Sequence, residues 1–272
     1  DYQFGKTDVA LDMQEPESGT RVQMNLTAAS FATVAEAIIP DVTAYDEPRA
    51  VFDAGLLAKG TSSTGPMTFE ISAEEGSDAF SIEGSASSAG SDFALDAQQV
   101  TYNGSNTDFD VTIRTSEFPV PIDVSLSTIE VGFGMPLEDS KEQGPFGLRL
   151  NLEDLTLNDA IWSLIDAAGA LPRDPATLTV DLAGTMNWLI DIMDDSATST
   201  NIDAPAEIHE LYVNELRLDV AGAQFAGEGE FTFDNTDMVT FPGMPAPDGE
   251  LRMTLLGGNG LLDKLVSMGL VP

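Results

Sequence analysis

The stretch NELRLDVAGAQFAGEGEFTFD, residues 214–234, carries the pattern that decides the fold. In its first half, apolar Leu216, Leu218 and Val220 alternate with polar residues, and Ala221-Gly222-Ala223 then interrupts the alternation. Apolar residues at every second position are typical of a strand with one face in water, and a short glycine-containing interruption indicates a turn. We therefore predict a β-hairpin here.

The second half of this hairpin places five residues on one face of its strand: Phe225, Gly227, Gly229, Phe231 and Phe233. Glycine weakens a strand and usually marks a close approach to the backbone. Two interpretations stay open, because either a packed helix or an apolar ligand such as an acyl chain could lie across these glycines. Under the second interpretation, the five residues are the candidate ligand-binding residues.

The same alternation continues outward through the middle of the chain, where we predict strands around residues 67–73, 80–84, 93–97, 109–113 and 120–133. The segment Asn103–Asn106 is expected to be a turn between two of them. The gaps are short, which favours antiparallel pairing, because parallel strands need long crossover connections. Each strand has one polar face, so the sheet is expected to bury only the other.

Four strand-like runs begin at Val22, Leu148, Leu178 and Leu251, and each is followed by an apolar stripe at helical spacing. The predicted helices cover residues 31–39, 157–168, 186–193 and 261–268, and Asn158 is the expected cap of the second. The predicted fold class is α+β: a long, twisted, mainly antiparallel β-sheet with about four short helices on its apolar face. We expect one β-rich domain over residues 1–272, part of a longer chain, with quasi-repeats 1–145 and 146–272.

Charge is the outlying feature of the composition: 46 acidic residues against 11 Lys and Arg give a net charge of −35. Such a field repels nucleic acid and anionic lipid headgroups. It favours solubility, and it also suits divalent cations or a basic partner. The hydrophobic fraction of 42% is sufficient for a core, and an ordinary chain of this size buries roughly three quarters of its unfolded surface.

The chain contains no cysteine, which excludes disulfides and thiolate chemistry. No apolar run approaches the roughly 20 residues that span a bilayer, so no transmembrane segment is predicted. The sequence opens at Asp1 without a signal-like segment and stops directly after a predicted helix. We expect the processed part of a longer, exported, periplasmic protein.

Catalytic motifs are missing from the sequence. His209 is the only histidine, and neither a nucleophile elbow, a zinc helix nor a phosphate-binding loop is present. The acidic runs 191–195 and 234–237 offer oxygen ligands for calcium, but ordinary solvated loops explain them better, because they offer too few ligands and neither matches the EF-hand spacing. We predict no catalytic residue, no metal site and no cofactor, and therefore no enzyme.

The C-terminal part resembles an uncharacterised proteobacterial family, domain of unknown function family 2125. The resemblance is strongest over residues 205–272, in the segments 213–218, 227–229, 247–251, 261–265 and 268–272. It implies an exported envelope protein and supplies no catalytic residue. More loosely, the glycine-bearing strands are similar to those of AsmA-like envelope proteins, whose sheets are linked with lipid handling.

The expected function is non-enzymatic: an envelope protein that presents an apolar sheet face or groove to a lipid-like ligand or an envelope protein. The alternative is a structural or assembly protein whose acidic surface docks a partner. A hydrolase acting through paired carboxylates is the least favoured, because 46 acidic residues produce such pairs by chance.

Overall fold

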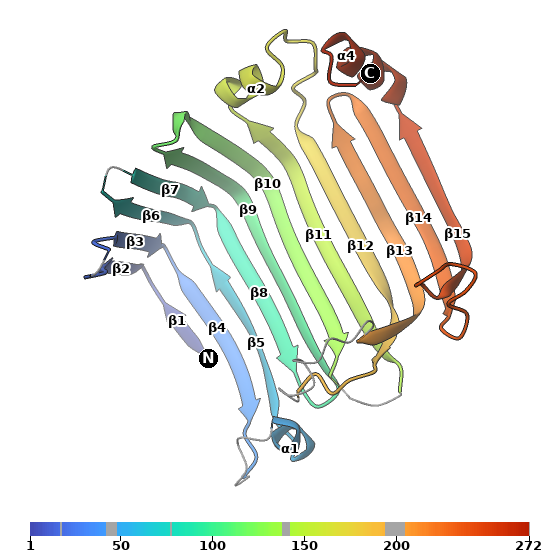
Figure 1. The fold of residues 1–272 in the computed structure, drawn as a ribbon. Helices are drawn as coiled ribbons and strands as arrows, with labels where there is room; N and C mark the ends of the chain where they lie inside the picture. The colour runs from blue at the N-terminus through green and yellow to red at the C-terminus, as the bar shows by residue number, and fades with distance from the viewer. Residues whose placement is uncertain (17, 42–47, 77, 138–141, 194–204, 272) are drawn as a thin grey trace.

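The computed structural model describes residues 1–16, 18–41, 48–76, 78–137, 142–193 and 205–271, and it forms a single antiparallel sheet of fifteen strands (Figure 1). The strands are β1 (Tyr2–Phe4), β2 (Thr7–Gln14), β3 (Arg21–Ala28), β4 (Phe31–Ile38), β5 (Leu57–Thr64), β6 (Met67–Glu75), β7 (Asp78–Ala86), β8 (Ser88–Leu95), β9 (Gln99–Thr115), β10 (Phe118–Pro136), β11 (Gly144–Leu157), β12 (Ala176–Trp188), β13 (Ala206–Val220), β14 (Ala223–Asp234) and β15 (Ala246–Leu256). The helices are α1 (Pro48–Asp53), α2 (Asp159–Ile165) and α4 (Gly258–Ser267).

The main part of the sheet runs β1-β4-β5-β8-β9-β10-β11-β12-β13-β14-β15, and a second arm runs β2-β3-β6-β7-β9. The two arms meet on β9, which pairs with β8 through residues 100–107 and with β7 through 110–115. Strands β3 and β4, β5 and β6, and β7 and β8 follow each other almost without a gap, so each pair is one long strand that bends. The second arm therefore turns away from the main part (Figure 1).

We call the line along which these strands bend the crease: residues 29–30, 65–66, 87, 108, 127 and 154. Asp108 and Asp154 adopt φ angles of +48° and +54°, a conformation that Asp tolerates better than most residues. Ser127 Oγ donates to Asp154 Oδ2 at 2.9 Å. Ala28, Ala86 and Leu126 beside the crease are among the few buried apolar side chains. Part of the small core of the molecule thus lies where the sheet bends.

The sheet is a single layer, and its surface area reflects this. The chain exposes 16698 Å², whereas a compact protein of 28.8 kDa exposes about 11,300 Å². The expectation that three quarters of the unfolded surface is buried is therefore wrong, and the buried share is roughly 60%. About 5,000 Å² that a second layer would cover stays open.

The helices differ from the prediction in number and in place. Residues 31–39 contribute strand β4, and residues 186–193 begin with the end of β12, so two of the predicted helices are wrong. The strand–helix quasi-repeat fails in the same two copies. A short apolar run fits the period of a helix as well as that of a strand. Residues 31–38 form a strand because they pair with β1 and β5. Residues 103–106 are likewise inside β9 and not in a turn.

The helices over 157–168 and 261–268 are confirmed as α2 and α4, but they lie at one end of the strands, while α1 lies at the other (Figure 1). The expected cap of α2 is also confirmed, since Asn158 Oδ1 accepts from Ile161 N at 3.3 Å. None of the helices among the described residues is long and apolar enough to cross a lipid bilayer.

Candidate functional site

One face of the sheet is apolar from edge to edge. Residues paired across antiparallel strands share a face, so the pairing of the strands traces rows across it. One row crosses ten strands: Ala35, Gly60, Phe93, Tyr102, Phe133, Leu148, Leu182, Val213, Gly229 and Leu251. A second row crosses the bent arm: Val9, Leu26, Phe69, Gly84, Val111, Val124 and Leu157.

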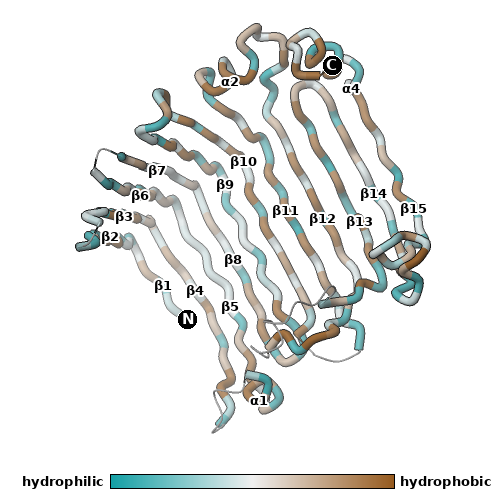
Figure 2. Tube along the Cα trace, viewed as in Figure 1, coloured by the Kyte–Doolittle hydropathy of each residue, from teal (hydrophilic) through white to brown (hydrophobic). Residues whose placement is uncertain are grey.

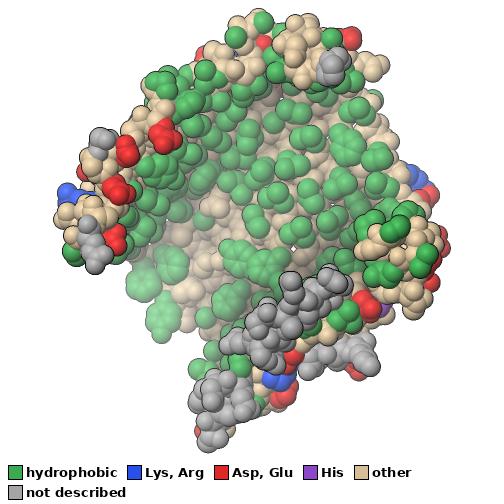
Figure 3. Space-filling model, viewed as in Figure 1, with side chains coloured by type: hydrophobic (Ala, Val, Ile, Leu, Met, Phe, Trp, Pro, Cys, Tyr) green, Lys and Arg blue, Asp and Glu red, His purple; other side chains and the backbone are tan. Residues whose placement is uncertain are grey.

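No described element packs across the middle of this apolar face (Figure 1). Figure 2 shows hydrophobic and hydrophilic residues alternating along the strands, and Figure 3 shows hydrophobic side chains spread over a hollowed face. Leu148 and Leu218, on strands with a neighbour on each side, remain 47% and 41% exposed. A monomer rarely exposes a contiguous apolar patch larger than a few hundred Å², and larger ones usually mark a binding surface.

Three glycines on this apolar face lie beside an aromatic ring of the residue paired with them on the next strand. The rings of Phe93, Phe69 and Phe146 lie within 2.9 Å of where a Cβ would stand on Gly60, Gly84 and Gly184 respectively. In each case the ring belongs to the directly paired residue. A large side chain beside a glycine on a neighbouring strand lies flat, so the face stays smooth.

The five candidate residues do share one face of β14, with Gln224, Ala226, Glu228, Glu230 and Thr232 exposed on the other. No helix crosses the two glycines. At Gly229, an added Cβ would lie 2.4 Å from Glu250 O and 3.0 Å from Leu251 Cδ1. At Gly227, the nearest atom would be Leu216 Cβ at 3.5 Å, an ordinary contact. Close packing between strands therefore explains Gly229, while a Cβ on Gly227 would make only ordinary contacts.

The three phenylalanines of β14 are only partly covered. The rings of Phe231 and Phe233 lie 6.4 Å apart, and Phe231 is paired with Leu211 on one side and Gly249 on the other. Phe225 is paired with Leu218 and Leu255. These contacts form an apolar strip across β13, β14 and β15.

Hydroxyl groups interrupt the apolar face where β5 meets β8. Ser62 and Ser91 are paired there, and their Oγ atoms are hydrogen-bonded to each other at 2.8 Å. Because these hydroxyls are already hydrogen-bonded, a ligand covering them would not need to supply a hydrogen bond. The face also carries six of the ten methionines, namely Met13, Met24, Met67, Met135, Met186 and Met253. Methionine adapts to irregular apolar shapes.

The opposite face carries the charges. A row of polar side chains crosses the middle of the sheet from Asp92 to Asn103, Arg149, Asp181 and Glu215, with Gly132 as the gap in it. Nine of the eleven basic side chains form ion pairs, those of Lys6, Arg21, Arg49, Lys59, Arg114, Arg149, Arg173, Arg217 and Arg252. The acidic side chains in excess of the basic ones therefore lie on this face and in its loops.

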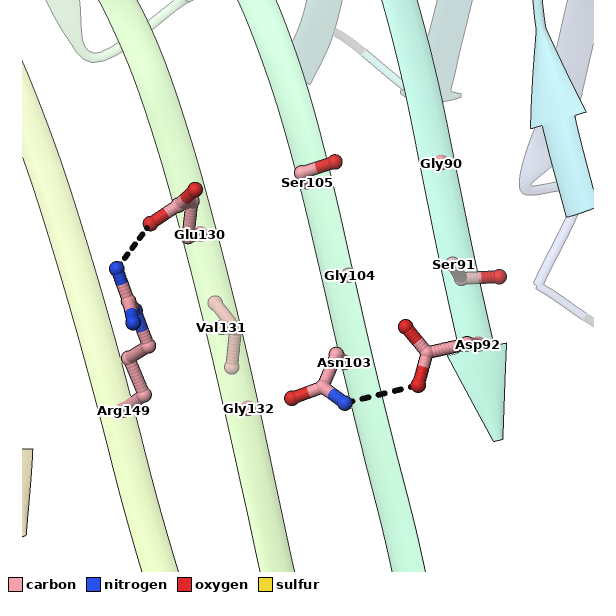
Figure 4. Close-up of a pocket in the computed structure, with 10 residues that line it drawn as sticks. All are labelled: Gly90, Ser91, Asp92, Asn103, Gly104, Ser105, Glu130, Val131, Gly132 and Arg149. Atoms are coloured by element: carbon pink, nitrogen blue, oxygen red, sulfur yellow. Dashed lines mark hydrogen bonds and ion pairs between the residues drawn. The ribbon is translucent and has the colours of Figure 1, made fainter. Parts of the chain in front are cut away.

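A depression of about 400 Å³ lies on the charged face, over β8–β11 (Figure 4). It forms because Gly90 and Gly132 lack side chains. Asn103 Nδ2 donates to Asp92 at 2.8 Å, and Arg149 Nη2 donates to Glu130 at 3.0 Å. Each carboxylate that lines it is thus held by a neighbour.

Carboxylates elsewhere have structural partners too. Asp234 Oδ1 accepts from Thr236 N at 2.9 Å, and Asp237 Oδ1 accepts from Val239 N and Thr240 N at 3.0 Å. The Thr236 hydroxyl lowers the pKa of Asp234, and hydrogen bonds from Thr240 lower that of Asp237. Asp191 of the other acidic run is ion-paired with Arg49 at 2.9 Å, while residues 194 and 195 lie outside the described part. Among the described residues, no group of three His, Cys, Asp or Glu has metal-binding geometry.

His209 lies at an irregularity of β13, between the pairs Thr185–Glu210 and Met186–Ile208. Its ring nitrogens contact Asn187 Oδ1 and, at 3.4 Å, Asn235 Nδ2. Asn187 is buried, and Asn235 Nδ2 also donates to Ile208 O at 3.0 Å. Amide partners on both sides give this imidazole a structural role in closing the irregular pairing.

No family model, curated protein or solved structure matches this chain. The resemblance to domain of unknown function family 2125 and to AsmA-like proteins therefore stays a prediction.

Sequence reasoning missed the extent of the site. It named five residues on one strand, whereas the apolar face continues across the whole sheet. The signal was present in Gly60, Gly84 and Gly184, each isolated inside an alternating run. Such glycines indicate close approach, but only the register shows which ring lies beside each.

Proposed function

We propose that this protein binds lipid-like molecules through their acyl chains on the apolar face of the sheet, as a non-enzymatic protein of the bacterial periplasm. A single observation carries the proposal: the apolar face is continuous over the sheet, and no element of the described part of the chain covers its middle (Figure 1). Phe225, Gly227, Gly229, Phe231 and Phe233 are the proposed contact residues on β14.

The chemistry of the face favours an acyl chain over a polypeptide. Backbone groups inside the sheet are already paired along the strands, and Ser62 and Ser91 satisfy each other. The face therefore offers apolar contact and almost no hydrogen bonds. A peptide laid on it would leave its own backbone groups unpaired, which is costly away from water. A hydrocarbon chain has no such groups.

The charge distribution fits the same occupant. The acidic side chains lie on the opposite face, so the apolar face can take up an uncharged chain without placing it beside carboxylates. A net charge of −35 disfavours adsorption to anionic headgroups. The expected complex is one in which the chain leaves the bilayer and lies on the sheet.

Native mass spectrometry with lipid extraction, on protein purified from its own envelope, tests the proposal first. A hydrophobic molecule bound in stoichiometric amount supports it, and a clean mass of the chain alone counts against it. Binding of Nile red, an uncharged dye, and its displacement by a monoacylglycerol give an affinity. Apolar burial predicts an affinity that is nearly independent of salt.

A matched pair of variants locates the site. Phe231→Glu puts a charge on the apolar face, whereas Thr232→Glu puts the same charge one residue away on the exposed polar face. Because Phe231 is only partly covered, we expect both variants to fold. We expect at least a tenfold loss of monoacylglycerol affinity for Phe231→Glu and little change for Thr232→Glu. Equal effects of the two variants would contradict a site on this face.

The alternative is an assembly protein that docks a cationic partner on its acidic face. It is favoured by one observation, that nearly all basic side chains are already ion-paired and leave the acidic excess unneutralised. This alternative predicts association that weakens steeply between low and moderate salt, because exposed charges are screened over about 8–10 Å. Salt dependence therefore separates the two functions.

A further inference from the structure

The outer edge of β15 is unpaired. β15 is the last strand of the sheet, its only neighbour in the described part is β14, and all of its residues after Ala246 are exposed (Figure 1). Its eleven residues pair with β14 without a register shift. Natural edge strands are usually short, bulged or interrupted by proline, since a free edge is a template for another strand. β15 has Pro247 near its start and the charged side chains of Asp248, Glu250 and Arg252, but no bulge in its pairing with β14.

We propose that two copies of this chain pair through β15, antiparallel and across a two-fold axis at Leu251, so that two sheets become one. A two-fold interface uses the same surface on both copies, so the edge has to be complementary to itself. This inference is independent of the lipid-binding proposal.

The charges on β15 meet that requirement in one register. With the axis at Leu251, Glu250 of each copy lies opposite Arg252 of the other, which gives two opposite-charge pairs on the polar face. Moving the axis to Glu250 brings Arg252 opposite Asp248 but sets glutamate against glutamate at the axis, and moving it to Arg252 sets arginine against arginine. Directly opposed like charges destabilise paired strands.

The neighbouring strand adds to the case for this register. On β14, Glu230 is paired with Glu250, a like-charge pair within one copy, while Glu228 is paired with Arg252. Arg252 of the same copy already pairs with Glu250, and the second copy would place a second arginine opposite this glutamate. Met253 of the second copy would come opposite Gly249 on the apolar face, where Leu251 already lies beside Gly229 in the same manner.

The free edge of β2 lacks this property. Antiparallel self-pairing of β2 about Ala10, next to the midpoint of this strand, would set Asp8 of one copy against Asp12 of the other. Asp8 and Asp12 are ion-paired within the chain with Lys6 and Arg21, as Glu250 is with Arg252, so the ion pairs within one copy do not separate the two edges. Self-complementary charge therefore singles out β15.

Charge reversal tests the pairing. We expect sedimentation at about 150 mM salt, where the Debye length is about 8 Å, to show a concentration-dependent dimer. Glu250→Arg should raise the dissociation constant of the dimer at least tenfold, because it sets arginine against arginine. The variant should fold, since the new arginine faces Glu230. The double variant Glu250→Arg, Arg252→Glu should restore the dimer. A monomeric wild type, a dimer indifferent to Glu250→Arg, or no rescue would overturn the proposal.

Cysteine cross-linking tests the register, because the chain has no cysteine of its own. In this register the two copies of residue 251 are directly opposed at about 4.5–5.5 Å between Cα atoms, within disulfide range. The copies of residue 253 are about 14 Å apart. Leu251→Cys should therefore cross-link and Met253→Cys should not, although Met253 is the more exposed, 61% against 38%. Equal or reversed cross-linking would overturn this register.

Discussion

Gly227 and Gly229 occupy equivalent positions on β14, yet the space around their missing side chains differs. A methyl group on Gly229 meets the backbone oxygen of Glu250, and one on Gly227 meets Leu216 at an ordinary distance. The first glycine along the strand is thus replaceable and the second is required by packing between strands.

We therefore expect Gly229→Ala to lower the free energy of unfolding by about 1–3 kcal/mol, the usual cost of overpacking. Gly227→Ala should raise it by about 0.5 kcal/mol, since alanine loses less chain entropy on folding. Urea titration of both variants measures the difference. Equal destabilisation would show that the backbone around Gly227 is tighter than the distances indicate.

Asp166 is the most buried side chain of the described residues, 1% exposed. Its carboxylate accepts from Leu171 N at 2.7 Å and Ala170 N at 2.9 Å. These hydrogen bonds, that from Leu171 first, lower the pKa of Asp166. A lowered folded pKa means that the carboxylate stabilises the fold above its ordinary pKa, and that this contribution is lost as the pH falls through the folded value.

We expect Asp166→Asn to be less stable than the wild type at pH 7, and the gap to close as the pH is lowered below about 4, the ordinary value. Thermal unfolding at a series of pH values measures this. Asp174→Asn, at an exposed aspartate of the following loop, is the control and should keep a constant offset. A stability difference between Asp166→Asn and the wild type that does not change with pH would mean that the charge of Asp166 does not stabilise this loop.

At the scale of elements, α4 depends on the turn that starts it. Gly257 has a φ of +69°, and a Cβ there would lie 2.4 Å from Gly222 O, in the hairpin turn of β13 and β14. Gly260, inside the helix, has open space around it.

We predict that Gly257→Ala destabilises the protein by about 1–3 kcal/mol through backbone strain and overpacking. Gly260→Ala should stabilise it by about 0.5–1 kcal/mol, the gain expected when alanine replaces a glycine inside a helix. Denaturant midpoints followed by circular dichroism give both values. No change in either variant would show that α4 unfolds separately from the sheet.

The elements also show what could be read from the sequence. Alternation identified the strands and their common face, because a period of two fixes the side of every residue; the hairpin around Ala221 and Gly222 is one case. It could not distinguish a short helix from a strand at residues 31–39, where pairing with distant β5 decided. It could not show that the face is uncovered either, because helix positions depend on contacts remote in sequence.

For the whole molecule, a single layer has a thermodynamic signature. The chain buries roughly 60% of its unfolded surface instead of about three quarters. The denaturant dependence of the free energy of unfolding, the m value, scales with the surface exposed on unfolding.

We accordingly expect an m value in urea about one fifth below that of a compact protein of the same length. The heat capacity change on unfolding should fall in the same sense. Equilibrium urea unfolding and calorimetry measure the two. An m value typical of a compact protein would mean that the apolar face is covered in solution, and the oligomeric state would then show whether a second copy covers it.

The bend at the crease determines how strongly the apolar face is curved. Several departures from regular strand geometry lie on one line through Gly65, Asp108, Ser127 and Asp154, while other irregularities of register lie in β13. A change of the bend along this line would alter the curvature of the apolar face while the strands on either side stay paired. The width of a ligand that the curved apolar face can contact is then determined by the backbone angles of a few small and acidic residues.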